Sequence, residues 1–252
     1  ALGTRNSSPE EVIDVRAPDL PPSPTVERIE GRGPAPAPNG VGTALFPGHY
    51  AGPAGQRPYK LYVPPGAGTR PMPLVVMLHG CTQDPDDFAT GTAMNEAAAS
   101  QGFYVLYPAQ TSNANPQRCW SWFKHNHHAR GRGEPALLAG MTQQILAQYA
   151  VDEDQVYVAG LSAGGAMAAI LGTAYPDIYA AVGVHSGLAP GSATDLPSAL
   201  AAMQGAGKPA SATPSGMPTI VFHGDADTTV HPMNGAAVIA SSVAIDTTTV
   251  DR

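Results

Sequence analysis

The stretch VYVAGLSAGGAM, residues 156–167, constrains the fold of this chain more than any other. Its alternating Val and Tyr residues predict a β-strand that runs into Gly160, and the small residues after Ser162 continue in the manner of a helix. A serine between glycines at a strand-to-helix turn has its hydroxyl presented outward, because the turn is too tight for side chains on its neighbours. This context makes Ser162 a candidate nucleophile. A Gly-rich connection that carries a serine by chance is the alternative interpretation.

Short β-rich runs alternate with longer helical runs along the chain, which is typical of βαβ units on a mostly parallel sheet. The runs are nearly continuously apolar, so we expect strands that are covered on both faces. The predicted strands are Tyr59–Val63, Leu74–Leu78, Tyr104–Tyr107, Val156–Ala159, Ala181–His185 and Thr219–His223. The predicted helices are Pro135–Tyr149, Gly164–Ala174 and Pro197–Met203. The pattern therefore predicts an α/β fold.

Composition sets the domain organisation and excludes some partners. Hydrophobic residues make up 43% of the chain and charged residues 13%, as in a globular protein with a substantial core. The net charge of -7 argues against nucleic acid as a partner, and no stretch approaches the roughly 18 consecutive apolar residues of a membrane span. Eight of the 26 prolines fall in the first 40 residues, so we expect a Pro-rich arm or linker over 1–42 and a folded domain over 43–252.

The candidate acid follows the last predicted strand, in TIVFHGDADTTV. Ligands of open α/β sheets gather at the carboxyl ends of such strands, and Asp225 and Asp227 both lie there. A serine nucleophile needs a base and an acid that orients the base, so either aspartate is a candidate. Each could instead serve as an Asx turn or a helix cap.

The candidate oxyanion donors lie near another strand end, in PLVVMLHGCTQ. Gly80 would let the backbone approach a bound carbonyl, and the amide of Cys81 could pair with the amide of Ala163 to form an oxyanion hole. We expect His79 to be a structural histidine beneath this loop rather than a proton-transfer group.

Five motifs, in this order and spacing, carry a family resemblance: LHGCTQ, CWSWF, RGEPALLAGM, VYVAGLSAGGAMAA and VFHGDADTTVHPMNG. Together they resemble the esterases of the poly(3-hydroxybutyrate) depolymerase family, over about residues 44–238. The resemblance implies an α/β-hydrolase fold, with a mostly parallel central sheet, helices on both faces and a nucleophile elbow at Ser162. The family pattern His-Gly-x-x-Asp-x-x-Val selects Asp227 over Asp225 as the triad acid. It also implies oxyanion donation at Cys81 and no cofactor.

The two cysteines, Cys81 and Cys119, fit either one disulfide or two free thiols by composition. The resemblance implies that they are bridged. A link across 37 intervening residues would stabilise the fold by about 3 to 4 kcal/mol. We therefore expect a secreted or periplasmic protein whose signal peptide is absent from the printed chain.

The chain departs from the family at the catalytic histidine. The family has a Gly-His-x-Trp type segment several tens of residues after the triad aspartate, and no such segment occurs before Arg252. Only His231 follows Asp227, and it would have to fold back across its own loop to reach Ser162. We expect the catalytic histidine beyond residue 252, in a C-terminal portion that this chain lacks, with His231 as a weak fallback.

The stretch RCWSWFKHNHHARGRGEP bears on the substrate. Trp120 and Trp122 could form an apolar wall for a polymer chain, or could pack between lid and core. Lys124 and Arg130 belong to a basic segment, 124–132, which is either a solvated loop or a rim that attracts anions. Some hydrolases that resemble this family cleave poly(aspartic acid), and such a rim would draw in that polyanion. The histidines of the segment lack a suitably spaced carboxylate or cysteine, so we expect no metal.

Three functions follow from these residues. The first is hydrolysis of a polyester such as poly(3-hydroxybutyrate), or its oligomers, through an acyl-enzyme on Ser162. The second is amide hydrolysis of poly(aspartic acid) by the same triad. The third is a non-catalytic α/β-hydrolase-like binding protein. The expected partner is a polymeric or oligomeric substrate, and the oligomeric state, including a homodimer, stays open.

Overall fold

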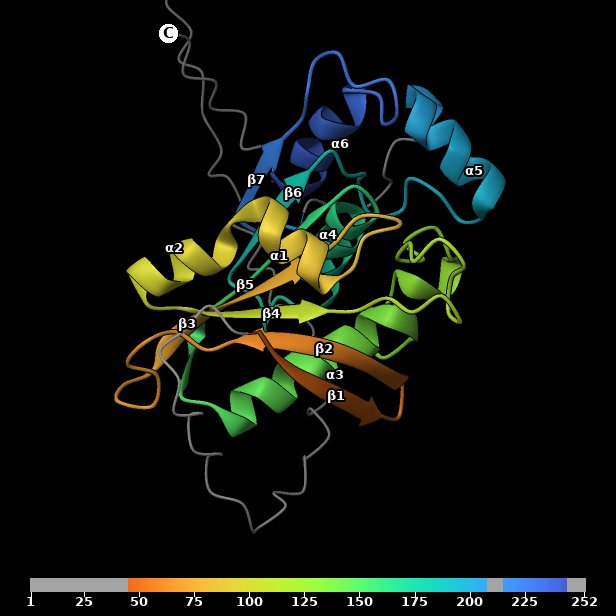
Figure 1. The fold of residues 1–252 in the computed structure, drawn as a ribbon. Coiled ribbons are helices and arrows are strands. Elements are labelled where there is room, and N and C mark those ends of the chain that lie inside the picture. Colours follow the sequence, from red (N-terminus) through yellow and green to blue (C-terminus); the bar gives the residue numbers. More distant parts are fainter. Residues whose placement is uncertain (1–44, 208–214, 244–252) are drawn as a thin grey trace, which may run out of the picture. The chain divides into compact units, whose positions relative to one another are not determined.

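The computed structural model describes residues 45–207 and 215–243, built around a seven-stranded sheet. Strands β3 to β7 run parallel, and β1 and β2 are antiparallel at one edge, in the order β1-β2-β4-β3-β5-β6-β7 (Figure 1). The strands are β1 (Leu45–Gly52), β2 (Gly55–Tyr62), β3 (Met72–Leu78), β4 (Tyr104–Pro108), β5 (Val151–Leu161), β6 (Ala181–His185) and β7 (Thr219–Phe222). The predicted arm over 1–42 lies outside the described residues.

Helices lie on both faces of the sheet (Figure 1). Helices α1 (Pro85–Thr92) and α2 (Met94–Gln101) pack against β4 on one face. On the other face lie α3 (Gly133–Gln148) and α4 (Ala163–Ala174), which contact each other and the strands between them. The remaining helical elements are η1 (His125–His127), α5 (Leu196–Ala201), the π-helical turn η2 (Ala202–Ala206) and α6 (Met233–Ser242). The predicted α/β architecture is confirmed.

Side-chain alternation along the strands divides the core into two layers. On β3, Leu74 and Val76 are fully buried in the cluster that contains α3 and α4, while Met77 belongs to the cluster of Phe88 and Ala98 from α1 and α2. A strand with apolar neighbours on both faces must be apolar at nearly every position. The unbroken apolar runs of β3 and β4 are therefore explained by burial on both sides.

Strand β7 departs from this prediction. Ile220 and Phe222 are 57% and 54% exposed, and the burial of the strand alternates residue by residue. Within the described residues β7 pairs only with β6, so it lies at an edge of the sheet. The expectation that this strand is covered on both faces is wrong for the part of the chain that the structure describes.

The sequence patterns located all six predicted strands and the three predicted helices, but missed one strand and three α-helices, as well as the short turn η1. The strand is β1, and the helices are α1, α2 and α6. Strand β1 buries only Tyr50 fully, and its pairing with β2 stabilises it more than any apolar run does. Helix α1 begins at Asp84, whose side chain accepts from the N–H groups of Asp86 and Asp87. Strand β1 and helix α1 thus depend on backbone pairing and on capping, to which a search for apolar periodicity is insensitive.

Candidate active site

The turn at Ser162 joins the end of β5 to the start of α4 in a conformation rare for a residue with a side chain. Its φ and ψ are 55° and -117°. The Ser162 N–H donates to the carbonyl oxygen of His185 across 2.8 Å, and Ala166 N–H donates to the Ser162 carbonyl. Strained backbone of this kind persists where the surroundings fix it, and such positions cluster at functional sites. The predicted strand, tight turn and helix are all present.

Two glycines make the turn sterically feasible. A Cβ on Gly160 would lie 2.4 Å from the carbonyl carbon of Gly164, and a Cβ on Gly164 would lie 2.1 Å from the carbonyl oxygen of Leu78. Both distances are shorter than real Cβ contacts. The first turn of α4 is therefore pressed directly against the end of β3, which brings the loop after β3 beside the nucleophile.

The loop after β3 carries the predicted oxyanion donor, Cys81. Gly80 N–H donates to Gln83 Oε1 at 2.9 Å, and Thr82 N–H donates to the carbonyl of Gln117 at 2.6 Å. The Cys81 N–H between them has no acceptor among the described residues. Ala163 is the first residue of α4, and the first N–H groups of a helix have no acceptor within the helix. Both amides are therefore available to a ligand.

A disulfide joins Cys81 to Cys119, as the resemblance implied. The bond ties the loop after β3 to the segment that leads into Trp120. The two cysteines are 38 residues apart in the sequence. The Trp120 Nε1–H donates to the carbonyl of His79 at 3.1 Å, which adds a second link between the same segments. The loop after β3 is thus held by two links to the segment around Trp120.

His79 is buried, and its two ring nitrogens have backbone partners. Gln110 N–H donates to Nε2 at 3.1 Å, so Nδ1 carries the proton and donates to the Gly80 carbonyl at 2.7 Å. Burial lowers the pKa of His79, which keeps the ring neutral. The ring has no free nitrogen for proton transfer, and the expected structural role is confirmed.

Asp227 lies on the loop after β7 and is held by that loop. Its Oδ1 accepts from the N–H groups of Thr229 and Val230, each at 2.9 Å. The Val230 N–H is the main cause that lowers the pKa of Asp227 below its ordinary value. One carboxylate oxygen is thus occupied by the backbone. Asp225, the other candidate, is exposed and makes no side-chain hydrogen bond to the described residues.

His223 and Ser186 contact this carboxylate and were not identified from the sequence. His223 Nε2 lies 2.7 Å from the Val230 carbonyl and 3.5 Å from Asp227 Oδ2. The hydroxyl of Ser186 also lowers the pKa of Asp227, with a smaller effect than the backbone. Ser186 has a φ of 47° and directly follows β6, so its position after a predicted strand was the signal that could have identified it.

The strand register places the nucleophile and the acid at the same edge of the sheet. Leu161, His185 and Phe222 are aligned on β5, β6 and β7, and Ser162 and Ser186 each follow directly. Adjacent strands are about 4.8 Å apart, so β5 and β7 are roughly 10 Å apart. This spacing leaves room for a side chain that links Ser162 to Asp227.

No histidine of this chain occupies that position. All eight lie within the described residues: His49, His79, His125, His127, His128, His185, His223 and His231. The nearest candidate on β6, His185, is exposed and stacks on Phe222 with ring centroids 6.4 Å apart. None of the eight bonds to the hydroxyl of Ser162 within the described residues.

The weak fallback base, His231, is bonded within its own segment. Its Nδ1 accepts from Met233 N–H at the start of α6, and a Cβ on Gly205 would lie 3.0 Å from its ring. Its backbone N–H donates to the Met203 carbonyl. The ring therefore supports the start of a helix beside η2, and it contacts neither Ser162 nor Asp227.

Trp120 and Trp122 do not form a substrate wall. Trp120 is fully buried and Trp122 is 5% exposed, and both belong to the main core. The Trp120 ring lies beside His79, with centroids 5.4 Å apart. Rings covered in this way cannot contact a polymer in solution, so the packing alternative describes them.

Arg130 is not free to attract a polyanion. Its guanidinium forms an ion pair with Asp177, donates to the Ala174 carbonyl and lies 4.7 Å from the centre of the Tyr175 ring. These residues surround the C-terminal end of α4, the end opposite Ser162. Arg130 therefore holds its loop to the fold at a distance from the nucleophile, and its role in substrate binding stays a prediction. Lys124 is exposed and lines an open hollow with Arg57 and Glu134.

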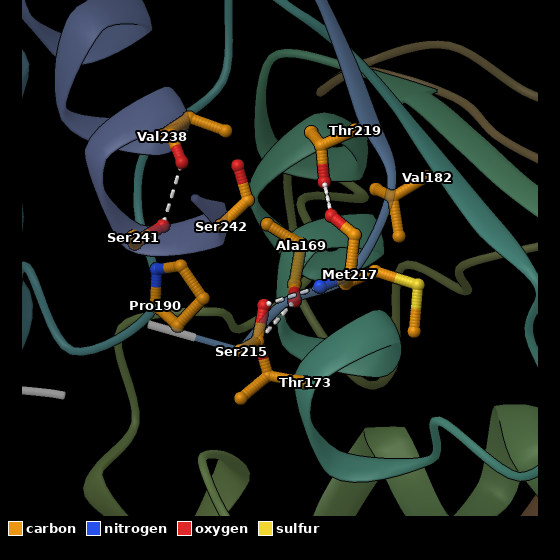
Figure 2. A pocket seen from close by; sticks show the side chains of 10 residues that line it. All are labelled: Ala169, Thr173, Val182, Pro190, Ser215, Met217, Thr219, Val238, Ser241 and Ser242. Carbon is orange, nitrogen blue, oxygen red and sulfur yellow. Dashed lines mark hydrogen bonds between the residues drawn. The ribbon is translucent and has the colours of Figure 1, made fainter. Parts of the chain in front are cut away.

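Figure 2 shows a different and very small pocket, of about 10 Å³, between α4, α6 and β7. The hydroxyls that line it bond to backbone groups beside them: Thr173 to the Ala169 carbonyl, Thr219 to the Met217 carbonyl and Ser241 to the Val238 carbonyl. They are satisfied locally, so they provide no polar group that seeks a ligand.

Residues 45–207 and 215–243 contain no cluster of three His, Cys, Asp or Glu side chains that could hold a metal ion. In the same part of the chain, every helix is too short or too polar to cross a bilayer.

Known proteins share much of this sequence. The family described as Esterase PHB depolymerase matches residues 57–249. Poly(3-hydroxyalkanoate) depolymerase C of Paucimonas lemoignei is 36% identical over 131 residues, which are 52% of this chain and 31% of that protein. Poly(3-hydroxybutyrate) depolymerase of Ralstonia pickettii is 38% identical over 129 residues, 48% of this chain and 26% of that protein. The matches thus span about a third or less of these relatives.

Solved structures share the fold. Acetyl xylan esterase from Aspergillus awamori superposes with a TM-score of 0.65 at 22% identity, over 77% of this chain and 80% of that one. The native structure of pOPH superposes with a TM-score of 0.58 at 16% identity, over 82% and 79%. With its mostly parallel sheet, helices on both faces and strained serine turn, the fold is that of the α/β-hydrolases. The chain belongs to the poly(3-hydroxybutyrate) depolymerase family of esterases.

Proposed function

We propose that this protein is a serine esterase that hydrolyses a polyester of hydroxyacids, such as poly(3-hydroxybutyrate) or its oligomers. The observation that carries the proposal is the Ser162 turn, whose strained backbone and two close-packed glycines have no role in a simple loop. The family match, which includes two polyester depolymerases, supports the choice of substrate.

The proposed chemistry proceeds through an acyl-enzyme. Ser162 Oγ attacks the ester carbonyl as a base takes its proton, and the negative charge that develops on the carbonyl oxygen is accepted by the N–H groups of Cys81 and Ala163. The carbon–oxygen bond to the alcohol then breaks, and the alcohol oxygen receives the proton. Water releases the acid from Ser162 by the same steps in reverse order.

The base in this mechanism is a histidine that we place beyond residue 252. None of the eight histidines of the chain is positioned to act as this base. Asp227, by contrast, is held at the same edge of the sheet as Ser162. Asp227 would accept from one ring nitrogen and fix the tautomer, so that the other nitrogen faces Ser162. The lowered pKa of Asp227 keeps the carboxylate charged for this purpose.

The poly(aspartic acid) alternative loses much of its support in this structure. It depended on free cations in the segment 124–132, and Arg130 is paired with Asp177. Lys124 and Arg132 are exposed, and Lys124 lines a hollow. Ester hydrolysis is therefore the function that we propose.

We also propose that the protein acts in an oxidising compartment, either outside the cell or in the periplasm. The disulfide between Cys81 and Cys119 supports this, because such bonds persist where thiols are not kept reduced.

The test of substrate is hydrolysis of three compounds side by side by the full protein and by Ser162→Ala. The compounds are a short-chain aryl ester, a 3-hydroxybutyrate oligomer and thermally made poly(aspartic acid). The proposal predicts preference for the hydroxybutyrate oligomer and loss of all activity in the variant. Preference for poly(aspartic acid), weakened by salt, would mean that the substrate is this polyanion and not a polyester. No hydrolysis of any compound would favour a non-catalytic binding protein.

A further inference from the structure

A polar groove lies on the same edge of the sheet as Ser162, toward strands β1 and β2. It consists of two open hollows of about 330 and 260 Å³, and Arg57 and Ala114 line both, so the hollows are adjacent. Strand β1 ends and β2 begins on the side where β4 ends (Figure 1). Three strand spacings separate β2 from β5, which is roughly 14 Å. A short oligomer could therefore span from Ser162 to the groove.

Positive charge predominates in the groove. Its cations are Arg57 and the exposed Lys124, and His49 lines the outer hollow with Asn113. The one carboxylate among the lining residues is Glu134. An anion that enters the groove therefore meets two cations and one acid.

The carboxylate of Glu134 already accepts hydrogen bonds from other groups of the protein. The amide Nε2 of Gln110 donates to Oε1, and Ser121 N–H donates to Oε2 at 2.7 Å. Arg57 Nη2 lies 3.6 Å from Oε1. A buried carboxylate that is bonded in this way is compensated within the protein, so Lys124 is left as uncompensated charge.

Arg57 has donors to spare. Its Nε donates to Gln110 Oε1 at 2.9 Å and its Nη1 donates to the Gln56 carbonyl at 2.8 Å. A guanidinium carries five N–H groups, and it suits the planar, two-pronged shape of a carboxylate. The Arg57 side chain is held rigidly at 16% exposure with some of its N–H groups unused.

His127 lines the inner hollow, but its Nδ1 is closed off from solvent. His127 is 6% exposed, and its Nδ1 has no hydrogen-bond partner; Glu134 Oε2 is 3.9 Å away, too far for a hydrogen bond. Buried polar nitrogens without partners are rare in native proteins. Because solvent does not reach this nitrogen, a ligand in the hollow would not bond to it directly.

We infer that this groove binds the terminal carboxylate of a hydroxyacid oligomer, an inference that rests on the proposed esterase function. Each such oligomer ends in one carboxylate, and every hydrolysis creates another. The carboxylate end belongs to the alcohol fragment, which leaves when the ester bond to Ser162 forms. The groove thus positions the leaving fragment, and cleavage proceeds near the carboxyl end of the oligomer.

The test measures binding to Ser162→Ala by calorimetry, at low salt, so that it does not depend on turnover. The ligands are the 3-hydroxybutyrate trimer as a free acid and as its methyl ester. We expect the free acid to bind roughly two- to fivefold more tightly, the range for an exposed ion pair. Adding Lys124→Gln should remove this preference. Adding Arg70→Gln, which deletes an exposed cation before β3 at the opposite edge of the sheet, should retain it.

A second variant protects the test against misfolding. Asn113 is exposed in the outer hollow, so Asn113→Asp adds a carboxylate there without disturbing the core. It should make the methyl ester bind at least as well as the free acid.

Three results would overturn the inference. The first is equal affinity for acid and ester in the Ser162→Ala protein. The second is loss of the preference in Arg70→Gln to the same degree as in Lys124→Gln. The third is tighter binding of a short poly(aspartic acid) that also depends on Lys124, which would mean that side-chain carboxylates are the ligand. Absence of hydrolysis by the protein with Ser162 intact would refute the esterase function separately, because the binding comparison does not require turnover.

Discussion

The N–H of Ser162 donates to the carbonyl oxygen of His185 across 2.8 Å, so the neighbouring strand β6 fixes the backbone of the nucleophile. This bond continues the parallel register of β5 and β6 by one residue beyond the sheet. The serine backbone is therefore tied to the sheet, although it occupies a strained conformation.

Replacing Gly164 by Ala should damage both stability and activity. The new methyl group would lie 2.1 Å from the Leu78 carbonyl oxygen, so α4 would have to move away from β3. Overpacking of this kind costs about 1–3 kcal/mol, and the shift separates the Ala163 amide from the loop of Cys81. Urea unfolding and kcat on an aryl ester measure the two effects.

Gly91→Ala is the matched control for this change. Gly91 lies in α1, has open space around it, and its φ is not positive. Alanine in a helix is about 0.5–1 kcal/mol more favourable than glycine, so this variant should be neutral or slightly stabilised. Equal losses in the two variants would show that close contact at Gly164 is not the cause.

Breaking the disulfide between Cys81 and Cys119 should lower stability and activity together. For a separation of 38 residues the entropy of the unfolded chain predicts a loss of about 3 to 4 kcal/mol. The Cys81→Ser, Cys119→Ser double variant should unfold at lower urea concentration than the oxidised protein. Reductant should shift the oxidised protein but not the double variant. An unchanged kcat in the double variant would mean that the loop holds its shape without the bond.

Asp227→Asn should lower kcat by roughly 10⁴-fold, because an amide cannot hold the catalytic histidine in the required tautomer. Asp225→Asn, two residues earlier on the same loop, should change kcat little, since Asp225 is exposed and bonds to none of the described residues. Similar losses in both variants, or a larger loss for Asp225→Asn, would contradict the assignment of Asp227 as the triad acid.

Stability should fall as the solution is acidified below about pH 6.5. Burial lowers the pKa of His79, His127 and His128. Below the ordinary histidine pKa, the unfolded chain therefore binds more protons at these residues than the folded protein does. The stability from their neutral forms is complete above the ordinary histidine pKa and is lost as pH falls toward the lowered values. Urea midpoints between about pH 7.5 and 5.5 measure this slope.

His79→Gln should be less stable throughout but should show a weaker pH dependence, because one of the three titrating rings is gone. A His79→Gln slope as steep as that of the parent would rule out His79 as a contributor.

The nucleophile turn could be predicted from sequence because its determinants are local. Gly160, Ser162 and Gly164 lie within five residues, and the strand and helix on either side have distinct periodicities. The family pattern His-Gly-x-x-Asp-x-x-Val identified Asp227 as the acid, and this pattern covers the loop on which Asp227 lies. Patterns within one segment are sufficient for features of this kind.

Features that depend on distant partners were missed or misread. Arg130 reads as a free cation in its basic segment, but its partner Asp177 is 47 residues away. The sequence left Trp120 open between a substrate wall and core packing, and the disulfide and its bond to the His79 carbonyl place it beneath the loop. Ser186 and Asp227 meet only because β6 and β7 pair. Local composition carries no information about such contacts.

The most direct test of the central claim is covalent labelling of the full protein with an active-site phosphonate, followed by peptide mass spectrometry. The account predicts a single adduct, on the peptide that contains Ser162, with loss of esterase activity in proportion to labelling and no adduct in Ser162→Ala. An adduct on another residue, or equal labelling of Ser162→Ala, would contradict the assignment of Ser162 as the nucleophile.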